Sequence, residues 1–313
     1  MASEMRQVDA VIHERLSSQV ALIDRISTYI VSAGGKRIRP RLVLLFARAL
    51  GFHGPERFEL AATVEVIHTA TLLHDDVVDE SSLRRGRATA NALFGNAASV
   101  LVGDFLYSRA FQMMVSVGRM RVLEVLADAT NVIAEGEVLQ LINMHDADIT
   151  VDDYLRVIRY KTAKLFEASA RLGAVLGGAD RALEDRCADY GRALGTAFQL
   201  VDDLLDYEGK SEDLGKNIGD DLREGKPTLP LLLAMQRGTE DERQLVRSAI
   251  EHGEVERLPE IVALVQRTGA LQATRAAAEA EADRARACLA TLPESEARRA
   301  LLELCVRAVH RSS

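Results

Sequence analysis

Three aspartates end an apolar stretch of the sequence and are followed closely by arginines. The run LLHDDVVDESSLRRG contains Asp75, Asp76 and Asp79, and then Arg84 and Arg85. Residues four apart on a helix share one face, so Asp75 and Asp79 can aim at one point, where two carboxylates call for a metal cation. Guanidinium groups match phosphate oxygens in pairs. The pattern therefore predicts a divalent metal that holds a phosphorylated substrate.

A second acidic motif repeats the first. The run FQLVDDLLD places Asp202, Asp203 and Asp206 in the same DDxxD spacing, again between aliphatic residues. An acidic cluster is usually a solvated helix face, but carboxylates in aliphatic surroundings are seldom left unpaired. Each motif follows a long apolar helix, so the two could face each other across one cavity. All candidate ligands are oxygen atoms, which favours Mg²⁺.

Basic residues near both motifs predict phosphate binding. The turn GGKRIRP carries Lys36 and Arg39 at the start of an expected helix, where a glycine turn with cations is a natural phosphate site. A solvated basic turn is the alternative. Lys216 and Lys226 follow the second motif, and this number of cations suits two diphosphates. His68 lies two helical turns before the first motif and could donate to a phosphate.

Three further polar residues lie on otherwise apolar helices. Lys161 and Thr162 belong to the run RVIRYKTAKLFEAS, and Gln199 precedes the second acidic motif. In isolation, each is more often an ordinary structural residue. Within a cavity lined by both motifs, the lysine could hold a leaving phosphate, and the threonine and glutamine oxygens could face developing positive charge.

The elements that position these residues are predicted to be helices. The 313 residues are 48% hydrophobic with only 6 prolines, and no alternating strand pattern occurs. We expect helices over 4–32, 39–50, 56–79, 90–115, 119–143, 151–176, 181–207, 227–237, 239–252, 257–267, 270–290 and 294–310. Glycines mark most breaks, and Pro227 suits a first helical position. The sequence predicts an all-α fold, with one domain over residues 1–313 forming a large helical bundle around a central cavity.

Charge and composition exclude several classes of protein. A net charge of −8 argues against a nucleic-acid-binding protein. No apolar run is long enough for a transmembrane helix, and the amino terminus is too charged for a signal peptide. The 3 cysteines lack the spacing of a zinc site. We expect a cytoplasmic protein with reduced thiols.

The sequence resembles the trans-isoprenyl diphosphate synthases, also called polyprenyl synthetases, over nearly its whole length. GGKRIRP, LLHDDVVD followed by RRG, KTA, FQLVDDLLD and GKNIGDDLREGKPTLP occur in the order typical of that family. Within the family, the run from HTATLLHDDVVD to NVIAEGEVLQL is similar to bacterial members that make the octaprenyl side chain of quinones. Members that make nonaprenyl chains are similar too.

The resemblance assigns roles to the candidate residues. Residues matching the isopentenyl diphosphate site are Lys36, Arg39, His68 and Arg85. Residues matching the Mg²⁺ ligands are Asp75, Asp79 and Asp202, with Asp76, Asp203 and Asp206 completing the catalytic motifs. Residues matching the surroundings of the allylic diphosphate are Arg84, Lys161, Thr162, Gln199, Lys216 and Lys226. The resemblance also implies three Mg²⁺ ions bound with the allylic diphosphate, a homodimer, and farnesyl diphosphate as the primer.

Two small residues bear on product length. Ala70 and Thr71 lie one helical turn before the first motif, where a growing hydrocarbon chain would pass between the helices. Short-chain members of the family are understood to close this path with bulky aromatic side chains. We therefore expect a long all-trans product, with eight units favoured and nine possible.

Three other interpretations remain open at this point. A terpene cyclase shares metal-triggered ionisation, but DDLLD and GGKRIRP count against it. His74 and Asp75 could form the dyad of an HD-type metal phosphohydrolase, which would leave the second acidic motif without a role. A non-catalytic subunit of a heteromeric synthase would be expected to lack intact acidic motifs, and this chain has both.

Overall fold

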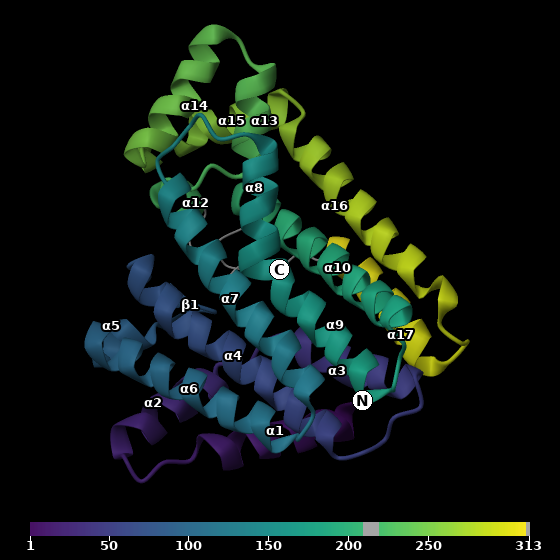
Figure 1. The fold of residues 1–313 in the computed structure, drawn as a ribbon. Helices are drawn as coiled ribbons and strands as arrows, with labels where there is room; N and C mark the ends of the chain where they lie inside the picture. Colours follow the sequence, from purple (N-terminus) through teal and green to yellow (C-terminus); the bar gives the residue numbers. More distant parts are fainter. Residues whose placement is uncertain (209–218, 311–313) are drawn as a thin grey trace. The chain divides into compact units, whose positions relative to one another are not determined.

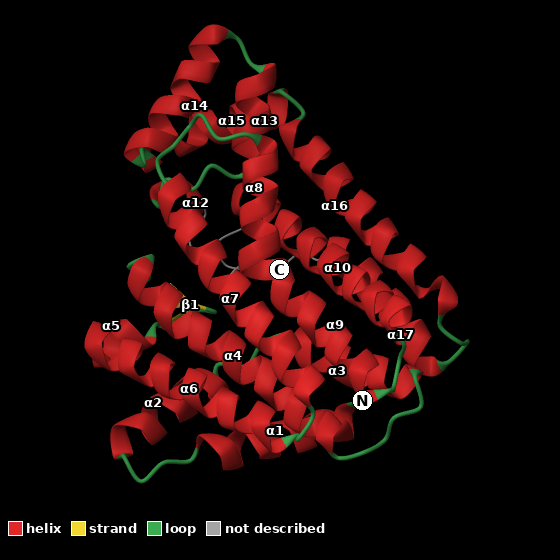
Figure 2. Cartoon of the chain, in the orientation of Figure 1, coloured by secondary structure: helices red, strands yellow, loops and turns green. Residues whose placement is uncertain are grey.

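The computed structural model describes residues 1–208 and 219–310, and this part of the chain is almost entirely helical (Figures 1 and 2). The all-α prediction is confirmed. The chain forms two compact units, each assembled from separate segments. The helices that contribute residues to both units are α7 (Met120–Asn143), α9 (Lys164–Leu176), α10 (Arg181–Glu208) and α17 (Glu296–Val309). Neither unit is a continuous stretch of sequence, and the single domain over 1–313 stays a prediction.

The first unit comprises Met1–Ala129, Leu165–Gly191 and Leu289–Leu301. Its own elements are α1 (Ala2–Leu16), α2 (Ala21–Ser32), α3 (Ile38–Ala49), α4 (Glu56–Val78), the strands β1 (Leu83–Arg84) and β2 (Arg87–Ala88), α5 (Ala90–Phe94), α6 (Asn96–Ser116) and the short 3₁₀ helix η3 (Leu289–Thr291). Helix α4 packs against α1, α3 and α6, as Figure 1 shows, and it is buried on most sides. This explains why its sequence is apolar all round, because such a helix has little solvated face.

The second unit comprises Thr130–Lys164, Arg192–Cys288 and the chain from Leu302 onward. Its own elements are α8 (Val151–Ile158), η1 (Arg159–Ala163), α12 (Asp220–Arg223), α13 (Leu229–Arg237), α14 (Glu240–His252), η2 (Val255–Arg257), α15 (Leu258–Arg267) and α16 (Ala270–Cys288). Helix α13 is mostly buried and packs against α8, α14, α15 and α16.

The predicted elements differ from the structure at their breaks. The predicted helix 4–32 is two helices, and the predicted helix 90–115 is interrupted at Gly95, whose φ of 87° is left-handed. The interval 151–176 contains a π-helical turn, η1, between α8 and α9. The role predicted for Pro227 is wrong, because Thr228 is the N-cap of α13 and Pro230 occupies its first turn.

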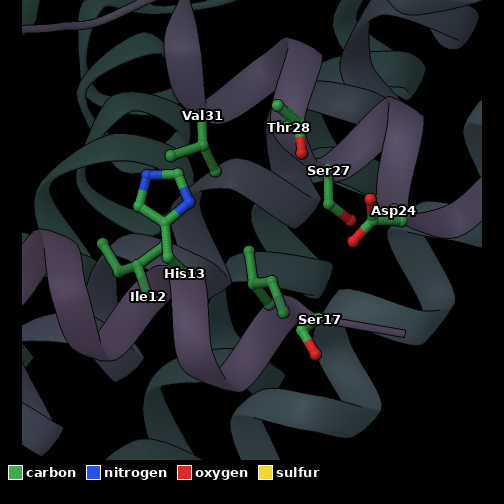
Figure 3. Close-up of a pocket in the computed structure, with 8 residues that line it drawn as sticks. Ile12, His13, Ser17, Asp24, Ser27, Thr28 and Val31 are labelled. Atoms are coloured by element: carbon green, nitrogen blue, oxygen red, sulfur yellow. The ribbon is translucent and has the colours of Figure 1, made fainter. Parts of the chain in front are cut away.

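A hollow lies between α1 and α2 (Figure 3). His13, Asp24 and Ser27 are among the residues that line it, and no candidate active-site residue is. The helices in the described ranges include none with both the length and the hydropathy needed to cross a membrane.

Candidate active site

The three aspartates of the first motif have different surroundings at the end of α4. Asp75 and Asp79 are half-buried, whereas Asp76 is fully buried. Oδ1 of Asp76 accepts hydrogen bonds from Nε of Arg84 at 2.7 Å and from a terminal nitrogen of the same guanidinium at 2.6 Å. Burial raises the pKa of Asp76, and the charge of Arg84 opposes this shift. Asp76 therefore orients Arg84, and Asp75 and Asp79 are the more accessible carboxylates.

The two arginines of the RRG motif lie at a tight hairpin, Arg84 in the first strand and Arg85 in the turn. Strands β1 and β2 pair Leu83 with Ala88 and Arg84 with Arg87, which leaves Arg85 and Gly86 as the turn. Both turn residues have left-handed φ angles, 53° and 72°, as a type I′ turn requires. The Arg84 guanidinium meets Asp76, whereas that of Arg85 donates to the carbonyl oxygen of Gly34. The hairpin thus directs the side chains of two adjacent arginines to different partners, Asp76 and the backbone of Gly34.

The cations of two distant sequence motifs converge in the first unit. A Cβ atom on Gly35 would lie 2.9 Å from the Arg85 guanidinium, so the glycine is needed for this close approach. The pKa of His68 lies well below its ordinary value, first because of burial and then because of the positive charges of Arg39, Arg85, Arg84 and Arg37. His68 is therefore neutral at pH 7 and lies within a field of guanidinium groups. We call Lys36, Arg39, His68 and Arg85 the basic cluster.

The three cations of the GGKRIRP turn are not equivalent. Arg37 adopts a left-handed φ of 49° and forms an ion pair of 2.5 Å with Glu65, which is only 5% exposed. Arg39 places its guanidinium over the ring of Phe166, with the carbon 4.5 Å from the ring centroid. Lys36 is exposed. In this turn, Arg37 is therefore neutralised by Glu65, whereas Lys36 and Arg39 belong to the basic cluster.

In the second unit, Lys161 and Thr162 lie within the π-helical turn η1. The ammonium of Lys161 pairs with Glu137 of α7 at 2.6 Å. Next to Glu137, Gly136 lies against the turn, and a Cβ atom there would be 2.6 Å from the backbone nitrogen of Lys161. Such π turns occur frequently at functional sites. Gly136 and Glu137 therefore determine where the turn and the lysine lie.

A chain of side-chain hydrogen bonds connects this turn to the second acidic motif. Thr162 donates to Oε1 of Gln199 at 3.0 Å, and Nε2 of Gln199 donates to Oδ1 of Asp203 at 2.7 Å. The Tyr154 hydroxyl donates to the other Asp203 oxygen at 2.5 Å. Burial, followed by the charge of Asp221, raises the pKa of Asp203 to about 7. Both oxygens of Asp203 are thus bound by protein donors.

The remaining residues of the second motif also differ from one another. Asp202 is half-buried. Asp206 is fully buried, and its Oδ2 accepts from the backbone nitrogen of Asp221 at 3.3 Å. Lys226 forms an ion pair with Glu224, and Lys216 lies outside the described residues. In this motif too, the first aspartate is the most accessible.

The carboxylates fit a magnesium site that substrate oxygens would complete. Within residues 1–208 and 219–310, no three His, Cys, Asp or Glu side chains lie together closely enough to hold a metal ion unaided. Mg²⁺ commonly takes one or two carboxylates and fills its octahedron with water and substrate phosphates. Asp75 and Asp79, half-buried and one turn apart, provide such a pair. Asp75 belongs to the first unit and Asp202 to the second, and the cavity shared by their motifs stays a prediction.

The residues linked to product length lie one turn before the first motif. Ala70 is fully buried, and the hydroxyl of Thr71 donates to the backbone oxygen of His68 at 2.8 Å. His74 stacks on Tyr107 of α6 with ring centroids 6.5 Å apart, and its Nε2 lies 3.3 Å from Asp104. The structure thus gives His74 packing partners on α6.

Four residues with clear positions near the candidates were not predicted: Glu65, Gly136, Glu137 and Tyr154. Gly136, Glu137 and Tyr154 support predicted residues, as space for the backbone, as counter-ion and as hydrogen-bond donor. Glu65 instead neutralises Arg37, which lies beside the predicted Lys36. The sequence offered a weak signal for two of them, because Gly136 and Glu137 interrupt an apolar helix. Tyr154 precedes Lys161 by seven residues, which alone looks like ordinary core periodicity.

Comparisons with known proteins show which family this chain resembles over nearly its whole length. The polyprenyl synthetase family model matches residues 20–265. The chain is 58% identical to an octaprenyl diphosphate synthase of Escherichia coli (strain K12) over 311 residues, covering 99% of this chain and 96% of the relative. It is 47% identical to a geranyl-diphosphate-specific all-trans-nonaprenyl-diphosphate synthase of Rhodobacter capsulatus, covering 99% and 96%.

A solved structure gives the same result for the fold. The polyprenyl synthase of Caulobacter crescentus CB15, complexed with calcium and isoprenyl diphosphate, superposes with a TM-score of 0.97 at 48% identity. The alignment covers 100% of this chain and 96% of that protein. The chain therefore has the isoprenoid synthase fold of these neighbours, in agreement with the predicted all-α bundle. The chain belongs to the polyprenyl synthetase family.

Proposed function

We propose that this protein is an octaprenyl diphosphate synthase. It adds isopentenyl diphosphate units to an allylic diphosphate, with farnesyl diphosphate as primer, and the all-trans product supplies the side chain of a respiratory quinone. A nonaprenyl product is the alternative within the family. The observation that carries this proposal is the convergence of Arg39 and Arg85, from two separate motifs, around the neutral His68.

The basic cluster would bind isopentenyl diphosphate. Arg39 and Arg85 supply fixed charge that phosphate oxygens match, and Lys36 adds a mobile ammonium at the turn. Because His68 is held neutral, one of its ring nitrogens donates a hydrogen bond while the imidazole adds no charge. Binding at this cluster would hold the double bond of the substrate in place for attack, which is a contribution of positioning.

Lys161, Thr162 and Gln199 would act on the allylic substrate. Lys161 would bind the diphosphate as its bond to the allylic carbon breaks, with Arg84, Lys216 and Lys226 as further contacts. The oxygens of Thr162 and Gln199 would face the allylic cation. The double bond of isopentenyl diphosphate then forms the new carbon–carbon bond, and the released diphosphate takes the proton that is lost.

We propose Asp75, Asp79 and Asp202 as the Mg²⁺ ligands, with three ions bound together with the allylic diphosphate. When bound, Mg²⁺ supplies neutralisation of the charge that develops on the leaving diphosphate. In this assignment Asp76, Asp203 and Asp206 complete the motifs by holding neighbouring protein groups, as their burial and hydrogen bonds support.

We propose that the protein is a cytoplasmic homodimer. Helix α6 exposes large apolar side chains, including Leu101 at 67%, Phe111 at 43% and Val115 at 59%. Exposed apolar stretches of this kind often mark protein interfaces. Sedimentation of the purified protein tests this, since a monomer at micromolar concentration would contradict the proposal.

One assay tests the activity. Purified protein is incubated with farnesyl diphosphate, isopentenyl diphosphate and Mg²⁺, and the product mass is measured. Octaprenyl diphosphate is the expected product. If nothing longer than the primer forms, prenyl transfer is refuted, whereas a nonaprenyl product would overturn only the chain length.

A further inference from the structure

Tyr154 is buried at the second acidic motif but belongs to no motif recognised in the sequence. It is 4% exposed, and its hydroxyl donates to Oδ2 of Asp203 at 2.5 Å. Burial and the neighbouring carboxylate raise its pKa well above the ordinary value, so the hydroxyl keeps its proton and remains a donor. The hydrogen bond is therefore formed by a protonated phenol and a buried carboxyl group.

The position of Tyr154 is fixed by the start of α8. Thr150 caps this helix, its hydroxyl accepts from the backbone of Asp153, and Asp153 bonds back to the cap. Tyr154 follows this capping box directly, and its own backbone nitrogen donates to the Thr150 oxygen at 3.0 Å. A side chain anchored at a capped helix start can impose its position on a partner.

The partner that Tyr154 holds is next to a proposed metal ligand. Asp203 follows Asp202 directly in α10, and its second oxygen is bound by Gln199. Gln199 in turn accepts from Thr162. Tyr154 is thus one end of a hydrogen-bonded chain that reaches two groups placed at the allylic diphosphate by the proposed function.

We propose that Tyr154 is a positioning residue for the magnesium and allylic diphosphate site, acting through Asp203. This inference rests on the proposed function. Side chains that orient metal ligands without touching the metal commonly change metal affinity or activity by about 10- to 100-fold when they are removed. Loss of the Tyr154 hydroxyl leaves Asp203 with one donor fewer, so Asp203 no longer fixes Gln199 and the adjacent Asp202.

The chain offers a matched control in Tyr190. This tyrosine is also fully buried, and its hydroxyl donates to the backbone oxygen of Leu301 at 2.7 Å within the first unit. Tyr154→Phe and Tyr190→Phe each remove one buried hydroxyl and keep the ring. Both variants should remain folded with comparable losses of melting temperature, which circular dichroism checks.

The test measures binding of inorganic pyrophosphate by calorimetry across a Mg²⁺ titration, together with KM for both substrates. In Tyr154→Phe, we expect about tenfold weaker Mg²⁺-dependent pyrophosphate binding and a higher KM for the allylic substrate, with KM for isopentenyl diphosphate unchanged. Tyr190→Phe should match the wild type in all three. Equal binding by the two variants would overturn the inference.

A second variant keeps the test independent of Tyr154→Phe. Asp203→Asn leaves one acceptor oxygen for two donors, the Tyr154 hydroxyl and Nε2 of Gln199, so it should weaken the same binding because the proposed effect passes through Asp203. Wild-type pyrophosphate binding in Asp203→Asn would also overturn the inference. If the wild-type protein elongates no prenyl chain, the proposed function itself fails. If the wild-type protein does elongate the chain but Tyr154→Phe and Tyr190→Phe bind pyrophosphate equally, only the inference about Tyr154 fails.

Discussion

Replacing Arg37 by methionine should destabilise the protein while sparing its binding of isopentenyl diphosphate. Glu65 is 5% exposed, and the Arg37 side chain beside it is 14% exposed. Removing one partner of a buried ion pair costs about 3–5 kcal/mol, and the lower figure suits this slightly exposed pair. At about 2.1 cal/mol/K per residue, the unfolding entropy of 313 residues is about 0.66 kcal/mol/K. Arg37→Met should therefore lower the melting temperature by about 5 °C.

Scanning fluorimetry measures the melting temperature, and steady-state kinetics measures KM for isopentenyl diphosphate. Arg39→Met is the contrasting variant, because Arg39 belongs to the basic cluster, and it should raise this KM more than tenfold with little change in melting temperature. In the double variant Arg37→Met with Glu65→Met, both charges are gone and stability should return towards wild type. If Arg37→Met instead raises KM like Arg39→Met and melts at the wild-type temperature, the division of this turn into structural and binding cations is wrong.

Three further predictions concern other parts of the site. The pKa of His68 is lowered below its ordinary 6.5, so the unfolded chain binds this proton first, and stability is lost as pH falls below 6.5. His68→Gln should reduce this loss, by at most about 1.4 kcal/mol at pH 5.5, and the same pH dependence of the unfolding free energy in variant and wild type would contradict the shift. Ala70→Tyr should shorten the product to four prenyl units or fewer, because Ala70 is fully buried and a ring there would block the predicted path of the growing chain. A full-length product by mass spectrometry would refute that path. Gly136→Ala should raise KM for the allylic substrate, since its Cβ would displace the backbone of Lys161. Gly177→Ala is equally crowded, with its Cβ 2.4 Å from the Cβ of Leu50, but it lies away from the turn and should leave this KM unchanged. Equal kinetics of the two variants would show that the turn tolerates the shift.

The predictable part of the site consists of residues whose chemistry is visible in their own side chains. The DDxxD spacing, the RRG motif and the GGKRIRP turn all predict ligands of phosphate and metal, and the structure brings Arg39, His68 and Arg85 together. Helix existence followed from hydrophobic periodicity, and most boundaries agree within a few residues. Both signals are local, which is why a single sequence reveals them.

The unpredicted part depends on pairings between distant segments. The family resemblance selects Arg39 rather than Arg37, but the spacing and side-chain types give no physical reason for the choice, because the difference is made by Glu65, which lies on another helix. The same holds for Tyr154 and Asp203, which lie 49 residues apart in the sequence. The break at Gly95 and the turn η1 were missed for another reason, since both preserve the hydrophobic pattern on either side. Tertiary contacts decide such details, and periodicity does not report them.

The π-helical turn η1 determines how the side chains of α9 are rotated about the helix axis relative to those of α8. A π turn carries one residue more than an α-helical turn, so the helix beyond it is rotated by about 100° from the position that an unbroken α-helix would give. Deleting one residue from Arg159–Ala163 would yield a regular helix with a better hydrogen-bond ladder. That helix would present Lys161 and Thr162 in the wrong direction, or α9 with its buried face turned from the core. A one-residue deletion in this turn would therefore give a more regular helix and remove the arrangement of Lys161 and Thr162 that we propose for binding the allylic substrate.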